Sequence, residues 1–159
     1  MTGTPGTAEP SRTVVQGGRA KAYRPLSAAK RGAAYREGVA AYRRGDFFAA
    51  HEHLEPAWMG TDDPVERDLH QGLIKLAAGF VHAVRGNPQG IAKNLTARAR
   101  LASALAGASS ATAARGHLPG LDLGRLIADI DVLLAKLADG RPVMPDDAPP
   151  LHRAPRRSA

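Results

Sequence analysis

The chain contains no cysteine among its 159 residues. This absence excludes disulfide bonds, thiolate zinc sites and cysteine nucleophiles, and it is typical of a reducing compartment. Any bound metal ion would depend on histidine, carboxylate or water ligands. No apolar stretch approaches the roughly 20 residues that cross a bilayer, and the first residues lack an apolar run of signal-peptide type. We therefore expect a cytoplasmic protein with no membrane partner.

The excess positive charge lies mainly at the two ends of the chain. Residues 1–26 carry four basic and one acidic side chains, and residues 140–159 carry four and two, within a net charge of +7. Both ends are rich in Gly, Pro or Arg, and such compositions bury too little apolar surface to offset ordering. We predict disordered tails at 1–25 and 140–159 around a helical domain at 26–139. Without a basic cluster on an ordered face, no specific nucleic-acid partner is expected.

The central part of the chain has few β-branched residues and much alanine and leucine. Its apolar positions recur every three or four residues, which predicts an all-α fold. Gly45-Asp46 and Gly86-Asn87 each combine a helix stop with a cap for the next helix, so they predict tight turns between antiparallel helices. We expect a compact bundle of about five helices built from such hairpins. The predicted helices cover residues 27–44, 47–59, 64–85, 88–106 and 121–137.

One predicted helix carries a group of residues whose side chains can bind a metal ion or transfer a proton. On residues 47–59, the side chains of His51, Glu55 and Trp58 fall within an arc of roughly 60 degrees, which we expect to face the core. His53 lies about 200 degrees from His51 by the same arithmetic. The run from His51 to His53 is therefore not expected to supply three convergent ligands.

A histidine and a glutamate four residues apart on an inward face have three uses. They can bind a metal ion, take part in proton transfer, or hydrogen-bond each other as a structural core pair. A transition metal usually needs a third protein ligand; His70, Gln71 and His82 on the helix over 64–85 are the candidates, and His82 is the one we assign. Trp58 and Gln71 are the candidates for the wall of a small-ligand pocket. No catalytic residue is assigned, because the chain has no phosphate loop, dinucleotide-binding glycine pattern or Ser-His-Asp order.

Three stretches of the sequence resemble a known family. They are GDFFAAHEHLEPAW at 45–58, QGLIKLAA at 71–78, and Gly86-Asn87 followed by Gly90. Together they resemble the bacterial and archaeal domain-of-unknown-function 309 family over about residues 31–105. Its hallmark is a histidine, three residues, a glutamate, two residues and then tryptophan or tyrosine. The resemblance implies an all-helical fold and a motif proposed to bind metal, but it implies no reaction.

These observations predict a protein that binds a divalent metal ion or a small ligand through His51, Glu55 and Trp58. One alternative is a non-enzymatic helical interaction module in which His51 and Glu55 form only a structural core pair. A further alternative is a metal-assisted hydrolase, which would need an open coordination position and a bound water. Whether the protein is an enzyme is left open, and a second copy of the chain is a further candidate partner.

Overall fold

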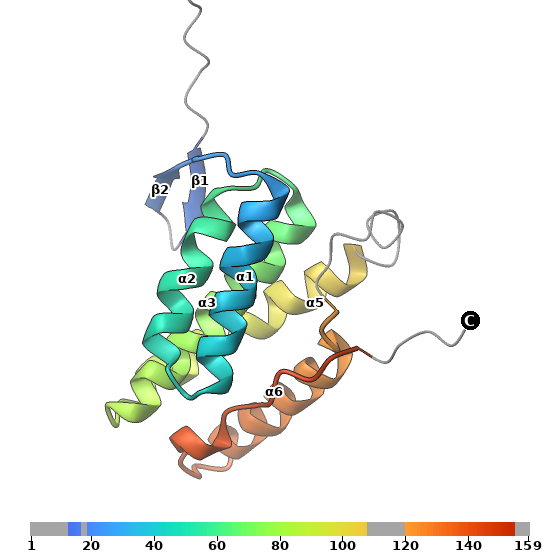
Figure 1. The fold of residues 1–159 in the computed structure, drawn as a ribbon. Coiled ribbons are helices and arrows are strands. Elements are labelled where there is room, and N and C mark those ends of the chain that lie inside the picture. Colours follow the sequence, from blue (N-terminus) through green and yellow to red (C-terminus); the bar gives the residue numbers. More distant parts are fainter. Residues whose placement is uncertain (1–12, 17–18, 108–119, 155–159) are drawn as a thin grey trace, which may run out of the picture.

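The computed structural model of the chain describes residues 13–16, 19–107 and 120–154 (Figure 1). Within these residues, two short antiparallel strands precede the helices, and a 3-10 turn at Pro145–Asp147 follows them. The predicted all-α bundle is confirmed, although the two strands were not predicted. The elements are β1 (Thr13–Gln16), β2 (Arg19–Ala22), α1 (Ala28–Arg43), α2 (Phe47–Met59), α3 (Pro64–Val84), α4 (Pro88–Asn94), α5 (Ala97–Gly107) and α6 (Leu123–Ala138).

The helix α3 is the centre of the bundle. It packs against α2 on one side and against α4 and α5 on the other, while α1 covers α2 and α6 packs against α5. Its apolar side chains face several neighbours, which explains why its hydrophobic stripe is wide. Among the described residues, no helix is long and apolar enough to cross a membrane. The largest fully buried side chains are Trp58, Phe80, Leu69, Ile74, Leu76, Leu95, Leu101 and Ile130.

The predicted helix hairpins form through local turn and capping chemistry. Gly45 has a φ of 78° and Gly86 a φ of 69°, a conformation that glycine adopts at little cost after a helix. After the first of these turns, the Asp46 carboxylate accepts a hydrogen bond from the Ala49 backbone N–H at 3.1 Å. Asn87 caps α4 in the same way. Both turns are confirmed.

The predicted helix over residues 88–106 is divided into α4 and α5. The last bond of α4 runs from the Leu95 N–H to the Ile91 carbonyl oxygen at 3.0 Å, and Arg98 N–H then bonds the Leu95 carbonyl oxygen at 3.2 Å. This second bond spans three residues rather than four, which tightens the chain as in a 3-10 turn. Both Leu95 and Leu101 are fully buried around this bend. An apolar pattern alone does not reveal such a break.

The N-terminal part of the described chain is held against the end of α2. The backbone N–H groups of Arg24 and Leu26 donate to the carbonyl oxygens of Met59 and Gly60, both at 3.0 Å. We call residues 23–27 the entry segment. The predicted disordered tail at 1–25 is thus wrong for residues 23–25, because these hydrogen bonds join the entry segment to residues far along the chain. Residues 1–12, 17 and 18 of that predicted tail lie outside the described residues.

Residues 141–154 form a C-terminal strap across the bundle, where disorder was predicted for residues 140–159. Three of its residues are buried: Val143 at 5% exposure, Leu151 at 6% exposure, and Pro149. The Tyr42 hydroxyl donates to the Pro149 carbonyl oxygen at 2.8 Å, and Arg43 donates to the Leu151 carbonyl oxygen at 2.6 Å. The prediction is therefore wrong for the strap, because α1 supplies partners for its backbone. Residues 155–159 lie outside the described residues.

The bond from Tyr42 to the strap makes a stability prediction. We expect Tyr42→Phe to lower the free energy of unfolding by about 1 kcal/mol or more, because a buried carbonyl group loses its donor. Tyr35→Phe is the matched control, since no described residue is a hydrogen-bond partner of the Tyr35 hydroxyl. Urea unfolding of both variants measures the difference. Equal losses in the two variants would show that the strap contributes nothing through this bond.

Candidate metal centre

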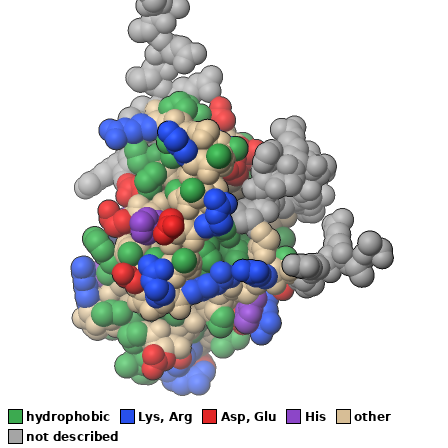
Figure 2. All heavy atoms as spheres, viewed as in Figure 1, with side chains coloured by type: hydrophobic (Ala, Val, Ile, Leu, Met, Phe, Trp, Pro, Cys, Tyr) green, Lys and Arg blue, Asp and Glu red, His purple; other side chains and the backbone are tan. Residues whose placement is uncertain are grey.

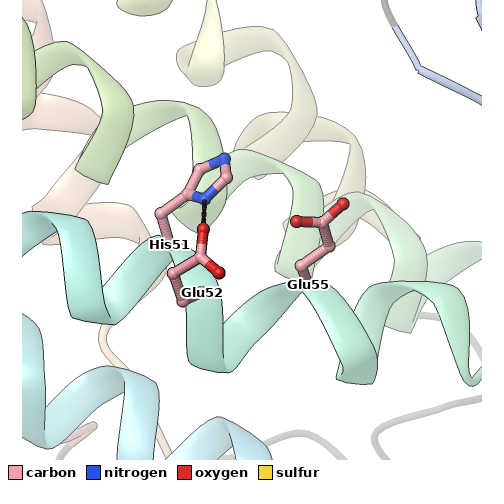
Figure 3. Close-up of side chains that lie close together, drawn as sticks. All are labelled: His51, Glu52 and Glu55. Carbon is pink, nitrogen blue, oxygen red and sulfur yellow. Dashed lines mark ion pairs between the residues drawn. The ribbon is translucent and has the colours of Figure 1, made fainter.

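The helix α2 places three metal-binding side chains near one another. Its N-terminus is capped by Asp46, and the helix continues through Pro56 to Met59. His51, Glu52 and Glu55 each offer one ligand atom, and these atoms all lie within 4.8 Å of one another. Figure 3 shows His51 and Glu52 extending together, with Glu55 one turn further along the same helix. Close approach of one imidazole and two carboxylates on a rigid element is suited to a divalent cation.

The three side chains lie at the surface rather than in the core. The His51 side chain is 31% exposed and that of Glu52 is 57% exposed, while Glu55 is half-buried. The His51 Nδ1 and Glu52 Oε1 atoms are 3.5 Å apart, which is long for a hydrogen bond. Figure 2 shows histidine and acidic side chains together at the surface over α2. The group is therefore accessible to an ion from solvent.

The predicted inward orientation of His51 and Glu55 is wrong. The buried face of α2 is centred elsewhere, and by helix geometry His51 and Glu55 lie roughly 70 and 110 degrees from its centre. They therefore flank the core instead of entering it. His51 and Glu55 are both partly exposed, so they do not form the structural core pair that was the alternative interpretation. The buried residues of α2 are Phe47, Ala50, Leu54, Ala57 and Trp58.

Glu52 is the third member of the group, and sequence reasoning missed it. A helical wheel gives the direction in which a side chain leaves the backbone, and Glu52 leaves about 100 degrees away from His51. A glutamate side chain has several rotatable bonds, so its carboxylate can return toward an adjacent residue. The available signal was the adjacency itself, a carboxylate directly next to the histidine. Considering how far the Glu52 side chain can extend, and not only the direction in which it leaves the helix, would have identified this residue.

The other predicted site residues lie elsewhere. His82, near the end of α3, has its Nδ1 atom 3.2 Å from the Asn87 side-chain nitrogen. Among the described residues, the group of three possible metal ligands does not include His82. Trp58 has no exposed surface and Gln71 is only 4% exposed, so both belong to the packed interior. The structure does not bring these three residues to His51 and Glu55 as ligands.

A cavity of about 310 Å³ is lined by two of the three side chains, those of Glu52 and Glu55. A cation held by these two residues would therefore face the cavity. The entry segment also lines the cavity, with Arg24 and Leu26. The remaining wall is apolar and is formed by Pro56 and Met59. The sequence did not predict this cavity, because the hydrogen bonds that place the entry segment join distant parts of the chain.

Comparison with known protein families adds one finding. Residues 35–94 match the family described as Domain of unknown function (DUF309). The predicted resemblance is confirmed for this segment, which is less than half of the chain. No curated protein and no solved structure matched the chain. The DUF309 segment contains His51, Glu52 and Glu55, whereas Arg24, the helix α6 and the C-terminal strap lie outside it.

Proposed function

We propose that this protein binds a divalent metal ion through His51, Glu52 and Glu55. The observation that supports the proposal is the distance of at most 4.8 Å among one ligand atom from each side chain. A divalent cation between two carboxylates at this separation would be attracted to both of them. A neutral imidazole nitrogen favours first-row transition metals over magnesium and calcium, which prefer oxygen ligands. Zinc or a similar ion is therefore the expected occupant.

The exposure of the group suits binding from solvent. Three protein ligands leave at least one coordination position open in a tetrahedral zinc site. That position would face the adjacent cavity, because Glu52 and Glu55 also line it. The proposal concerns binding, and a metal-assisted reaction is not part of it. We place this activity in the cytoplasm, as the lack of cysteine suggests.

Metal content and affinity test this proposal. Untagged protein is expected to take up one zinc ion, measured by calorimetry and by elemental analysis. The variants His51→Ala and Glu55→Gln should each weaken zinc binding at least about tenfold, equivalent to about 1.4 kcal/mol. His53→Ala is the matched control, because His53 is exposed on the same helix and is not part of the group.

Two results would contradict the proposal. The first is an absence of stoichiometric binding for zinc, manganese, cobalt and nickel by the wild-type protein. The second is an equal loss of affinity in His51→Ala and His53→Ala, which would indicate nonspecific association with surface histidines. Circular dichroism of each variant would show that the helices are retained, so a loss of affinity reports on the ligands.

The interaction module remains the second candidate function, and one observation supports it. Phe48 is 60% exposed and Val84 is 62% exposed. Both side chains line a groove of about 230 Å³ between the turn after α1 and the end of α3. Exposed apolar side chains next to a groove are typical of surfaces that contact other proteins. This alternative stays a prediction, and its surface is separate from the metal-binding group.

A further inference from the structure

Basic side chains gather on the face between α1 and the C-terminal strap, as Figure 2 shows. Three exposed arginines belong to this face, Arg36 and Arg43 on α1 and Arg153 on the strap. We call these three residues the arginine band. Arg43 donates to the Leu151 carbonyl oxygen at 2.6 Å, so its guanidinium lies against the strap two residues before Arg153. A backbone bridge between Leu121 and Arg153 fixes the next part of the strap beside the start of α6.

The positive charges of the arginine band are largely uncompensated. Among the described residues, no carboxylate forms an ion pair with any of its three members. Asp129 acts electrostatically on the neighbouring Tyr42 hydroxyl, and it is half-buried. By helix geometry, the stripe of α1 around Arg36 and Arg43 contains no acidic residue. The other members of that stripe are Ala29, Gly32, Val39 and Ala40.

The spacing of the band favours an extended anion over a small one. The Arg36 guanidinium reaches back along α1 to Gly32, whereas that of Arg43 lies against the strap. Residues 32 and 43 are separated by roughly 16 Å along a helix axis. One phosphate group is too small to bridge this separation, but a polymer with regularly repeated negative charges can contact both groups. The planar guanidinium also matches a phosphate in geometry, because it can donate two parallel hydrogen bonds.

The side chains between the arginines indicate which polymer fits. Protein interfaces usually depend on large anchors such as tryptophan and tyrosine, whereas the stripe of α1 offers mainly small side chains. Charge must therefore supply most of the affinity, as it does for nucleic-acid backbones. Unpaired bases would need exposed aromatic rings on which to stack. Tyr42 and Phe47, which line a hollow together with Arg43, are both buried. A duplex therefore fits this face better than a single strand.

We propose that the arginine band binds the phosphate backbone of double-stranded nucleic acid without reading its base sequence. No basic cluster on an ordered face was evident from the sequence, because Arg153 lies in the predicted disordered tail. The strap brings Arg153 beside α1 and so completes the cluster. This binding does not depend on the proposed metal centre, whose three ligands lie on α2.

Fluorescence anisotropy with a labelled DNA duplex of about 20 base pairs tests the proposal. The full chain should bind two duplexes of unrelated sequence equally, and more weakly as salt rises from about 50 to about 200 mM. The double variant Arg36→Gln/Arg153→Gln should bind at least about tenfold more weakly at the lower salt concentration, with a salt slope reduced by roughly 2. Arg43 is left unchanged, because it also holds the strap.

Two further variants control for net charge and for the identity of the cation. Arg85→Gln/Lys93→Gln removes two exposed charges near the α3–α4 turn and should change the affinity less than about threefold. Arg36→Lys/Arg153→Lys retains both charges and should keep most of the salt dependence. Zinc uptake by all these variants should match that of the wild type, so this inference and the metal proposal can fail separately.

Several outcomes would overturn the inference. One is an absence of duplex binding by the wild-type protein at the lower salt concentration. Equal losses in the two glutamine double variants would show that net charge alone is responsible, and an equal loss in the lysine variant would show that charge is not the cause. Tighter binding to polyglutamate or to phosphatidylserine vesicles than to the duplex would assign the face to an acidic protein or to a membrane surface instead.

Discussion

Replacement of Trp58 by alanine is expected to lower the free energy of unfolding by about 3–5 kcal/mol. The indole has no exposed surface and belongs to the main hydrophobic core. Its removal would leave a cavity between packed helices, which the surrounding backbone cannot fill. Trp58→Phe should cost less, because the ring retains much of the buried apolar area. Urea unfolding followed by circular dichroism measures both effects.

The exposed residue Val132 provides the control for this measurement. It is 67% exposed on α6, so Val132→Ala is expected to change stability by less than about 0.5 kcal/mol. Zinc binding of Trp58→Phe should match that of the wild type, because the tryptophan is not among the proposed ligands. If Trp58→Phe instead lost metal binding at unchanged stability, Trp58 would be part of the site, as its position in the sequence suggested.

Stability is expected to fall as the pH decreases from about 6.5 to about 4, in part because of His70. Its side chain is 2% exposed on α3, and neither ring nitrogen has a hydrogen-bond partner among the described residues. Burial lowers the pKa of His70 from 6.5 to about 4, and the nearby Arg31 adds to this while Glu66 opposes it. Between these values the unfolded chain binds a proton that the folded chain excludes, so acid favours unfolding.

The size of this effect follows from the difference between the two pKa values. At the lower end of the range it reaches about 3 kcal/mol, since one pKa unit corresponds to about 1.4 kcal/mol. The variant His70→Leu should therefore lose less stability than the wild type between about pH 7 and about pH 4.5. His53→Leu is the control, because His53 is exposed. The interpretation is wrong if both variants show the pH dependence of the wild type.

His70 lies in a layer of polar side chains between α1 and α3. The Arg31 Nε atom is 3.1 Å from a Glu66 carboxylate oxygen, and the Thr61 hydroxyl donates to the other oxygen at 3.1 Å. The Tyr35 and His70 rings pack with their centroids 5.9 Å apart. Glu66 thus has hydrogen-bond partners within the layer, whereas neither ring nitrogen of His70 has one among the described residues. That difference makes His70 the member of the layer most sensitive to acid.

Much of the fold could be predicted because the decisive interactions are local. Asp46 caps α2 through Ala49, only three residues away, and Asp63 caps α3 through Val65 and Glu66. Such contacts depend on residue types at fixed short spacings, which the sequence displays directly. The break between α4 and α5 was missed, because a continuous apolar pattern is compatible with one long helix or with two.

The candidate site was predicted only in part. The sequence identified His51 and Glu55 through their spacing of four, and these residues do lie together. The third ligand was assigned to His82, whereas the structure places Glu52 beside them. The spacing rule treats each side chain as a direction from the helix axis, so it did not allow for the long, flexible side chain of Glu52. It also placed His51 and Glu55 in the core, because it did not weigh the apolar residues on each side of them.

The sequence by itself determined that α2 carries the ligands of the proposed metal centre, and where the hairpin turns lie. Only the tertiary structure decided which other residues lie around those ligands. The entry segment reaches Met59 and Gly60 through backbone hydrogen bonds, and the strap reaches Tyr42 from 107 residues away. Nearly all residues carry the same backbone N–H and C=O groups, so the sequence does not show which distant backbone group a bond of this kind will join. The position of Arg24 at the cavity lined by Glu52 and Glu55 depends on such bonds.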